Sequence, residues 1–400
     1  MKHKSEQQTN VIILGGGYAG MMAALRLAGK VKKRNVQLTL INGQSQFVER
    51  IRLHQKAANQ SLPHRSYTRF LSGTNIQFVQ GLAAKIDPQA KMITVQSDKE
   101  VQMMVYDYLV YALGSTVDTT SVPGVAQYAE SLADLNTTEH IQAQLLSLSG
   151  QAGRILIVGG GLTGIEAATE IAETYPDLQV SLLTRRALGD DLSEKGAAYL
   201  VRVCDRLRIT LLEEKSVCRL EAQQAYCDNG MTIPFDLCLW AGAFRVPSLA
   251  SDSDIPTNPQ QRIMVDECLR SLAYPEIYAV GDAAFTPLRM ACATAMPMGC
   301  YAADHLANQI LAAPLPPAFE FGYAMRCISL GRGDALIQMV KPDDAPKGQI
   351  YTGRMAVWIK ELICRATIWM MFFEKRFPGA YRWPKARLAR SHDQTNLVTS

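Results

Sequence analysis

The sequence predicts an α/β protein with two parallel-sheet domains, the second inserted in the first, followed by a C-terminal α+β region with an amphipathic helix. A weak internal duplication supports this prediction. The segment Val11-Ile-Ile-Leu-Gly-Gly-Gly-Tyr-Ala-Gly20 is echoed by Ile155-Leu-Ile-Val-Gly-Gly-Gly-Leu-Thr-Gly164. In both copies an apolar strand leads through a glycine-rich turn into a helical stretch, and a second apolar strand follows. Each copy then closes on a strand that ends in glycine, over residues 106–114 and 235–242.

Length and composition allow two or three buried cores and exclude several classes of protein. The 400 residues are 48% hydrophobic and 20% charged, as in ordinary globular proteins. A net charge of +4 gives no global field that would collect nucleic acid, although local basic patches remain possible. No window reaches the roughly 18 uninterrupted apolar residues of a membrane span. The polar segment Met1–Asn10 lacks the apolar stretch of a secretory signal, so we expect a cytoplasmic protein.

A third strand returns the chain to the first domain. Ile277-Tyr-Ala-Val-Gly281-Asp282 is a strand that runs into Gly-Asp, and helical sequence follows from about Ala291 to Leu311. Prolines at 314, 316 and 317 mark a linker, after which we expect strands up to Val340 and a helix from Gly353. The predicted division is a first domain of residues 1–118 and 250–315, an inserted domain of residues 119–249, and a C-terminal region of residues 316–400.

The first glycine-rich turn has the parts of a dinucleotide site. Gly15 permits the tight bend, Gly17 lets the backbone approach a pyrophosphate, and Gly20 allows close packing of helix on sheet. The helix that opens with Tyr18 and Ala19 would offer its free N–H groups and its dipole to the pyrophosphate. An acid usually ends the second strand and holds the ribose. Here Asn42 stands there, which can form hydrogen bonds but brings no charge.

The second turn repeats these parts at Gly159, Gly161 and Gly164, with Leu162 and Thr163 opening its helix. Glu166 follows early in that helix. Its carboxylate either stabilises the helix by its interaction with the helix dipole or lies near a nicotinamide. The second strand ends in Thr184-Arg185-Arg186, with no carboxylate for a ribose 2′-hydroxyl. Because arginine matches phosphate geometry, we favour NADPH over NADH. The alternative is that both arginines lie in solvent.

This order of motifs, from Val11 to about Val340, resembles the FAD-dependent pyridine nucleotide oxidoreductases with two glutathione-reductase-type, Rossmann-like domains. The resemblance is greatest to the type II NADH dehydrogenase-like branch. It implies FAD at the first turn and NADH or NADPH at the second. The residues expected to contact FAD are Gly15, Gly17, Tyr18, Ala19, Gly20, Asn42, Arg50, Ala83, Ala112, Gly114, Gly281, Asp282, Thr294 and Ala295. Those expected to contact the nicotinamide nucleotide are Gly159, Gly161, Leu162, Thr163, Gly164, Glu166, Thr184, Arg185, Arg186 and Gly242.

Two positions in the FAD set carry alternatives. Asp282 is expected at the ribityl-phosphate part of FAD, because a carboxylate after a strand end can accept hydrogen bonds from ribityl hydroxyls; otherwise it is a turn-forming residue. Arg50, together with Arg52 and His54, follows the first crossover, where similar reductases pass beneath the flavin. These side chains would orient or neutralise reduced flavin, or form a solvated basic surface.

The positions of the cysteines, and the residues found where related enzymes carry glutamine, limit which reactions the protein can catalyse. Nine cysteines form no close pair, so reduced thiols and no metal site are expected. The first is Cys204, so the segment where disulfide reductases carry redox cysteines has none, and dithiol chemistry is excluded. Met296 and Cys300 stand where similar quinone reductases carry two glutamines, which puts a quinone site in doubt. Cys292 and Cys300, the candidates for a sulfide site, are interpreted as helix-packing thiols.

The function implied is hydride transfer from NAD(P)H to FAD, followed by electron transfer to a quinone or a similar small acceptor. Hydride transfer requires stacked rings about 3–3.5 Å apart in a dry site, so we predict no catalytic side chain. Two alternatives remain open. One is a ferredoxin-reductase-type enzyme that passes electrons to a protein partner, and the other is a redox sensor that binds both nucleotides and turns over slowly.

The last helix carries an apolar stripe. Met355, Trp358, Ile359, Leu362, Ile363, Ala366, Trp369, Met370 and Phe373 recur at steps of three and four residues. We place Arg354, Lys360, Glu361 and Arg365 on the opposite side. Basic residues follow at Lys375, Arg376, Arg382, Lys385, Arg387 and Arg390. The stripe either contacts a membrane surface through residues 354–390, which would be the inner face of the cell membrane, or packs on the flavin domain, or forms a homodimer.

Overall fold

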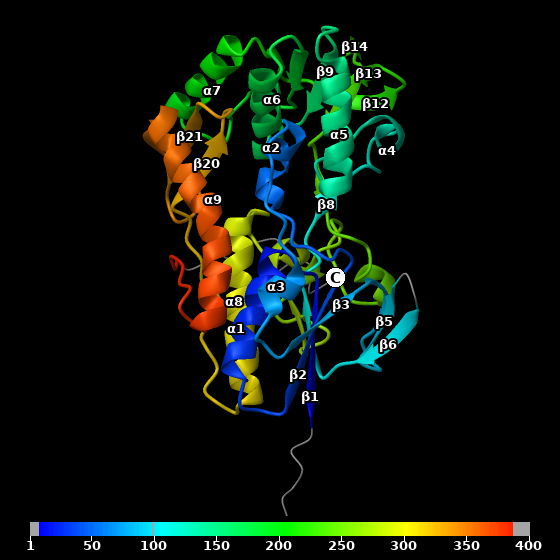
Figure 1. The fold of residues 1–400 in the computed structure, drawn as a ribbon, viewed down its shortest axis with the longest axis vertical. Coiled ribbons are helices and arrows are strands. Elements are labelled where there is room, and N and C mark those ends of the chain that lie inside the picture. Colours follow the sequence, from blue (N-terminus) through cyan, green and yellow to red (C-terminus); the bar gives the residue numbers. More distant parts are fainter. Residues whose placement is uncertain (1–7, 98–99, 387–400) are drawn as a thin grey trace, which may run out of the picture.

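The computed structural model describes residues 8–97 and 100–386, and its first sheet has five parallel strands in the order β18-β7-β1-β2-β3 (Figure 1). The strands are β1 (Thr9–Leu14), β2 (Val36–Asn42), β3 (Ile76–Gln80), β7 (Tyr108–Tyr111) and β18 (Ile277–Ala279). Because β18 follows the whole second sheet in the chain, the first sheet is completed by residues on both sides of an insertion. The predicted fold class is confirmed.

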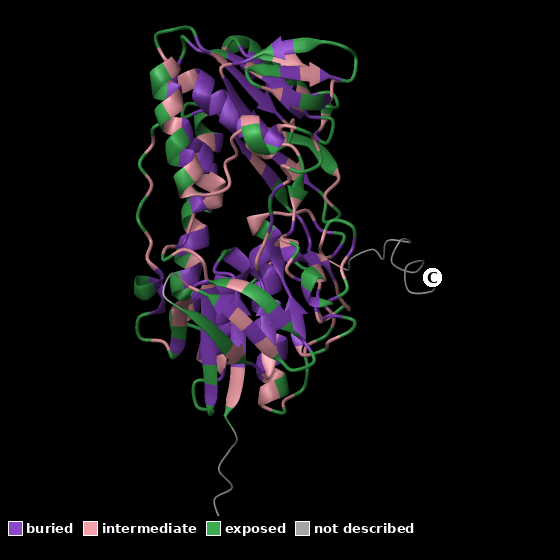
Figure 2. Cartoon of the chain, turned by 90° about the vertical axis from the view of Figure 1, so that its right-hand side faces the viewer, coloured by how far each residue is buried: buried purple, intermediate pink, exposed green. Residues whose placement is uncertain are grey.

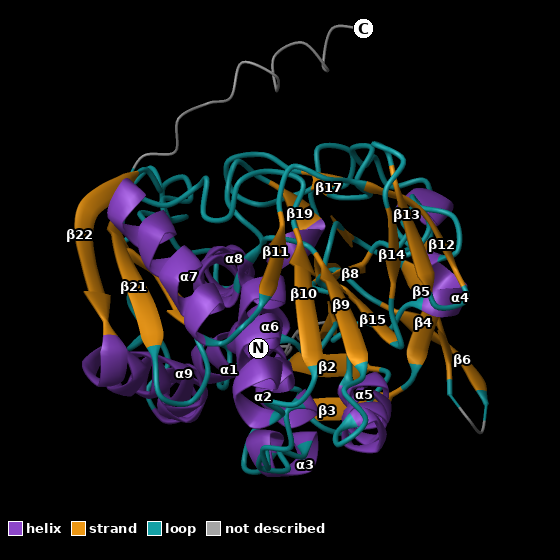
Figure 3. Ribbon diagram, turned by 90° about the horizontal axis from the view of Figure 1, so that it is seen from above, coloured by secondary structure: helices purple, strands orange, loops and turns teal. Residues whose placement is uncertain are grey.

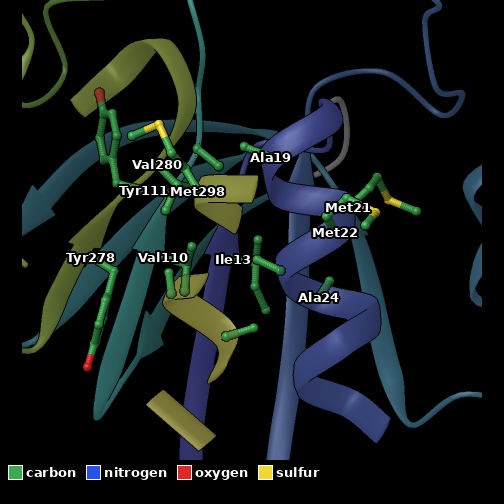
Figure 4. Close-up of a cluster of buried hydrophobic side chains, with 14 of the residues drawn as sticks. Ile13, Ala19, Met21, Met22, Ala24, Val110, Tyr111, Tyr278, Val280 and Met298 are labelled. Carbon is green, nitrogen blue, oxygen red and sulfur yellow. The ribbon is translucent and has the colours of Figure 1, made fainter. Parts of the chain in front are cut away.

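Two helices pack on the first sheet and lie close to each other. They are α1 (Tyr18–Lys30) and α8 (Cys292–Ile310). A Cβ added at Gly299 of α8 would lie 2.1 Å from the Ala19 carbonyl oxygen of α1, so glycine lets the two backbones meet. Figure 4 shows part of the buried cluster around α1, which includes Met21 and Met22 of α1 and Ile13 of β1.

The second sheet repeats the first with four parallel strands in the order β11-β10-β9-β15. The strands are β9 (Arg154–Val158), β10 (Gln179–Leu183), β11 (Thr210–Leu212) and β15 (Leu237–Trp240). The helices are α5 (Leu135–Leu148), α6 (Leu162–Thr174) and α7 (Glu194–Arg206). Buried residues gather in the sheets of the two halves and in the helices that cover them (Figure 2).

Small elements join and extend the two halves. The connecting segments pair antiparallel as β8 (Thr116–Val117) and β16 (Phe244–Arg245). Two antiparallel sheets are β4 (Leu82–Asp87), β5 (Met92–Gln96), β6 (Val101–Val105) and β12 (Val217–Glu221), β13 (Gln224–Cys227), β14 (Thr232–Pro234). The remaining short elements are α2 (Leu53–Ala57), α3 (Tyr67–Leu71), α4 (Val125–Tyr128), β17 (Ile263–Met264), β19 (Ala284–Phe285), η1 (Arg50–Arg52), η2 (Ser251–Ser253) and η3 (Gly281–Ala283).

The C-terminal region is an antiparallel sheet and one long helix, as the sequence predicts. The elements are β20 (Met325–Ser329), β21 (Ala335–Val340), β22 (Pro346–Thr352) and α9 (Gly353–Arg376). Seen from above, β21 and β22 stand at one edge beside α7 (Figure 3), while α9 runs down along α8 and α1 (Figure 1). Among the described residues, no helix is both long and apolar enough to cross a bilayer.

The orientation of α9 corrects one sequence expectation. Its buried face is Ala356, Lys360, Cys364, Thr367, Ile368, Met371 and Glu374. The apolar stripe faces outward instead, with Trp358 72% exposed and Trp369 56% exposed. Most of the stripe is therefore not packed on the rest of the chain, although Ile359 and Met370 are partly buried against it, and Lys360 lies on the inner face. Arg387 and Arg390 lie outside the described residues.

A buried ion pair fastens α9 to the first domain. Arg26 of α1 is 2% exposed and Glu374 is fully buried, with 2.6 Å between Arg26 Nε and Glu374 Oε1. The same guanidinium contacts Asp304 Oδ2 of α8 at 3.0 Å and donates to the Tyr381 carbonyl at 2.7 Å. Three helices and the chain after α9 thus share one cation.

Candidate active site

One cavity of about 1050 Å³ lies between the two halves, and both glycine-rich turns open into it. Its walls also include the N-terminus of α8 and the inner face of α9. The expected site residues that line it are Gly15, Gly17, Tyr18, Ala19, Asn42, Arg50, Ala112, Gly114, Gly161, Leu162, Thr163, Glu166, Gly281, Asp282 and Ala295. Those outside its lining are Gly20, Ala83, Thr294, Gly159, Gly164, Thr184, Arg185, Arg186 and Gly242.

The two turns have the same steric frame. Gly15 and Gly159 have φ of +105° and +130°, and a Cβ on either would lie within 2.5 Å of a backbone oxygen. A Cβ on Gly20 or Gly164 would lie 1.9 Å from the carbonyl oxygen of Gly15 or Gly159. These four positions hold helix against strand, because only glycine fits them.

The two middle positions of the turns face empty space. No heavy atom lies within 4 Å of a Cβ built on Gly17 or Gly161. These glycines are the N-caps of α1 and α6, and neither makes a side-chain capping bond. The first N–H groups of both helices are therefore free for an anion such as a pyrophosphate. A dinucleotide fits each turn by this test.

Asn42 braces the first turn. Its Oδ1 accepts a hydrogen bond from the Gly16 amide at 2.9 Å, and its Nδ2 donates to the Gln44 carbonyl at 3.0 Å. From the other side, the Tyr67 hydroxyl donates to the Gly16 carbonyl at 2.8 Å. Asn42 thus holds the turn itself, a use that the position of the residue at the end of β2 did not reveal.

The end of β10 is more open. Thr184 is buried and its hydroxyl donates to the Arg186 carbonyl. Arg185 and Arg186 are both exposed, and Arg186 forms a surface pair with Asp190 at 3.2 Å. Such a pair is worth little, so both guanidinium groups are available to a nucleotide phosphate.

Asp282 lies in the cavity beside Ser115 and Arg262, which sequence reasoning missed. The Ser115 hydroxyl donates to Asp282 Oδ2 at 2.6 Å, and Arg50 donates to the Ser115 carbonyl at 2.6 Å. Arg262 Nε donates to the Asp282 carbonyl at 3.2 Å. Ser115 directly follows the expected Gly114, which is the signal that could have identified it.

A buried charge cluster forms the far wall of the cavity. Glu166 of α6 and Lys360 of α9 are 8% and 9% exposed, and their charged atoms are in contact. Glu166 also accepts from the Ser329 amide at 3.0 Å, and His54 Nδ1 is 3.7 Å from its Oε2. Burial raises the pKa of Glu166, but Lys360 foremost brings it below its ordinary value. Burial lowers the pKa of His54 to about 4, so His54 is neutral at pH 7 and cannot neutralise an anion.

Residues 9–299 match the family described as pyridine nucleotide-disulphide oxidoreductase. The chain belongs to this family. It is 25% identical to the type II NADH:quinone oxidoreductase of Staphylococcus haemolyticus over 90% of this chain and 95% of that protein.

Two solved structures share the fold of this pyridine nucleotide-disulphide oxidoreductase. The sulfide:quinone oxidoreductase from Aquifex aeolicus superposes with a TM-score of 0.80 at 20% identity, covering 96% of this chain and 98% of that chain. NDH2 from Plasmodium falciparum in complex with NADH superposes with 0.76 at 16% identity, covering 94% and 99%. The predicted class, an FAD-dependent NAD(P)H oxidoreductase, is confirmed.

This family member carries thiols but no disulfide among its described residues. Cys292, Cys327 and Cys364 line the cavity, and all are free. Burial raises the pKa of Cys292 to about 12 and that of Cys327 to about 11, so both are neutral thiols at pH 7 and weak nucleophiles. The described residues contain no group of His, Cys, Asp and Glu placed to hold a metal ion. Met296 and Cys300 are buried and do not line the cavity.

Three residues that line the cavity each have a buried polar atom without a hydrogen-bond partner among the described residues. These atoms are the Tyr18 hydroxyl, His54 Nε2 and Trp240 Nε1. Buried polar atoms are almost always paired in a complete structure. Together with the two bare turns, they fit a site that is completed by FAD and a nicotinamide nucleotide.

Proposed function

We propose that this protein is an NAD(P)H:quinone reductase, with FAD at the first turn, the nicotinamide nucleotide at the second, and the quinone reached along α9. The observation that carries the proposal is that one cavity joins both turns to the buried Lys360–Glu166 pair. The proposed division into residues 1–118 with 250–315, 119–249 and 316–400 is supported by the pairing of β8 with β16, where the two connections lie side by side.

The chain's own residues position the reactants. Bound FAD supplies the capacity to take a hydride and to pass on its two electrons. The bare N-termini of α1 and α6 fix the two pyrophosphates, so that the two rings meet in the cavity between the halves. Overall, NAD(P)H, one proton and a quinone give NAD(P)⁺ and a hydroquinone. Lys360 and Glu166 stand where they can supply that proton.

The outer face of α9 suits a lipid surface. Trp358, Leu362, Trp369 and Phe373 are each more than 40% exposed. Arg354, Arg365 and Arg376 are exposed beside them. A helix of this kind lies in the interface of a membrane, where each basic residue adds about 1 kcal/mol near anionic lipid.

The same helix connects this face to the cavity. Ile363 is 36% exposed on α9 and also lines the cavity, next to Cys364. An acceptor dissolved in lipid would thus reach the site past Ile363. The exposed tryptophan and phenylalanine side chains on this face, beside its basic residues, favour a lipid-soluble acceptor over an acidic protein partner.

Anaerobic stopped-flow mixing tests the electron transfer. The FAD-loaded protein is mixed with NADPH or NADH and then with a soluble quinone, while the flavin absorbance is followed. We expect bleaching by a nicotinamide nucleotide and recovery with the quinone. Bleaching without recovery by any quinone would reject the acceptor, and no bleaching would reject the enzyme.

Vesicle binding tests the membrane face. Sedimentation with vesicles of anionic and neutral phospholipid should retain the wild type, and Trp358→Ser with Trp369→Ser should lower binding at least tenfold. Val101→Ser on β6 is the matched control, since Val101 is also exposed (66%) and lies away from α9. Equal binding by all variants would contradict the contact, and a stable dimer that loses its partner in the tryptophan variant would assign the face to a second copy instead.

A further inference from the structure

Three carboxylates lie on one face of α6 and lead away from the cavity. Glu166, Glu170 and Glu173 are spaced by four and three residues, which places them in a row along the helix. Glu166 lines the cavity. Glu170 is fully buried, and Glu173 is partly exposed.

The loop between β20 and β21 covers this row with polar groups. The Ser329 amide donates to Glu166 at 3.0 Å. Arg332 reaches back from the same loop, with its Nε 2.8 Å from Glu170 Oε1 and its guanidinium 3.2 Å from the Ser329 hydroxyl. The Arg332 amide donates to Glu173 at the outer end. A polar group of this segment therefore lies against each of the three carboxylates.

We propose that this row is the route by which a proton enters from solvent, with Glu170 as the internal relay between Glu173 and the Glu166–Lys360 pair. The proposal rests on the quinone reductase function, in which each turnover takes one proton in addition to the hydride. That proton would be bound by Glu170, passed to Glu166 one helical turn away along α6, and given to the quinone oxygen as the hydroquinone forms. Solvent then restores the proton at Glu170.

The surroundings of Glu170 suit a relay better than a fixed salt bridge. The charged or titratable groups around the row are Arg332 from the loop, Glu166 and Glu173 from α6, His54 from α2 and Lys360 from α9. Burial raises the pKa of Glu170 to about 7 in spite of Arg332. A carboxyl that gains and loses its proton near neutral pH can transfer one in either direction.

The test is the pH dependence of reoxidation in the FAD-loaded protein. After reduction by NAD(P)H, recovery with a soluble quinone should slow about tenfold between pH 6 and pH 8, because a group with a pKa of about 7 loses its proton over that range. In Glu170→Gln, reoxidation should be at least fivefold slower at pH 6 and no longer depend on pH. Reduction by NAD(P)H should be unchanged, since it needs no proton. Glu170→Asp should restore the pH profile.

Asp334→Asn is the matched control for loosening the loop. Asp334 is a buried carboxylate of the same loop, but it binds Tyr199 and Arg206 of α7 rather than the row. It should keep the wild-type pH profile. Glu173→Gln, at the partly exposed end, provides a second variant if Glu170→Gln does not fold, and should slow reoxidation at pH 8.

The outcomes distinguish a failure of the proton route from a failure of the proposed quinone reductase function. A wild-type profile in both Glu170→Gln and Glu173→Gln, or a loss of pH dependence in Asp334→Asn as well, would overturn the route while leaving the quinone reductase in place. A reduced wild-type protein that no quinone reoxidises would overturn the proposed function and the route with it.

Discussion

Lys360→Met is the change that tests the buried charge cluster most directly. Lys360 contacts the Glu166 carboxylate and donates to the Cys327 carbonyl at 3.3 Å, and methionine keeps most of its volume. The variant leaves Glu166 buried with one backbone amide, from Ser329, and with the uncharged His54. Removing one partner of a buried ion pair costs about 3–5 kcal/mol, because the other charge is left without compensation.

The loss should depend on pH in a defined direction. Without Lys360, burial alone dominates, so the pKa of Glu166 in the folded state should rise above its value in the unfolded chain. A carboxyl with a raised folded-state pKa adds no penalty below an unfolded pKa of about 4.3, and it destabilises the fold progressively as the pH rises through the folded-state pKa. The difference from the wild type should therefore be small near pH 5 and largest near pH 8.

Urea unfolding of the FAD-loaded protein at pH 5 and pH 8 measures this. The double variant Lys360→Met with Glu166→Gln should recover most of the stability lost at pH 8, since it removes the uncompensated charge. An equal loss of stability at both pH values, with no recovery in the double variant, would refute the reasoning and show that Lys360 acts through packing alone.

Three further outcomes are expected. Gly161→Ala should change the free energy of unfolding by less than about 0.5 kcal/mol, because nothing lies near its Cβ, yet raise the Kd for NAD(P)H at least tenfold in calorimetric titration; an unchanged Kd would remove the nucleotide from this turn. Replacing both Arg185 and Arg186 by Ala should weaken NADPH selectively, and equal loss for NADH would count against the NADPH preference. Glu374→Gln should cost about 1.5–3 kcal/mol, because the buried Arg26 loses one charged partner but keeps Asp304 and the Tyr381 carbonyl, and should make α9 susceptible to limited proteolysis; a helix as protected as in the wild type would contradict its role as an anchor.

The two glycine-rich corners could be predicted because their cause is local. A positive φ at Gly15 and Gly159 and a close carbonyl beside Gly20 follow from a strand that turns at once into a helix, and the chain must provide glycine at those places. The Gly281-Asp282 turn was predicted from the strand that runs into it, and this strand, β18, belongs to the first sheet. Steric requirements of the local backbone can therefore be recognised from consecutive residues in the sequence.

The charge cluster could not be predicted, because its members meet only in three dimensions. Lys360 is 194 residues from Glu166, and the apolar period of α9 placed it opposite the stripe without showing which side faces the core. In the structure the stripe faces outward and the inner face holds Ala356, Cys364 and Thr367, small or polar residues that leave room for the cavity. The rule that the apolar face of a helix is its buried face therefore fails for α9.

The two corners differ in how they are held, and that difference matches two kinds of ligand. In the first, side chains of Asn42 and Tyr67 bind the amide and the carbonyl of Gly16, so the turn is fixed on both sides before any ligand arrives. In the second, the equivalent Gly160 faces the methyl group of Thr184, whose hydroxyl is turned away toward the next residues of the chain. A pre-organised turn binds its ligand without a further ordering cost and releases it slowly, as a resident FAD requires. A turn that ends in exposed arginines suits a nucleotide that must leave after every turnover.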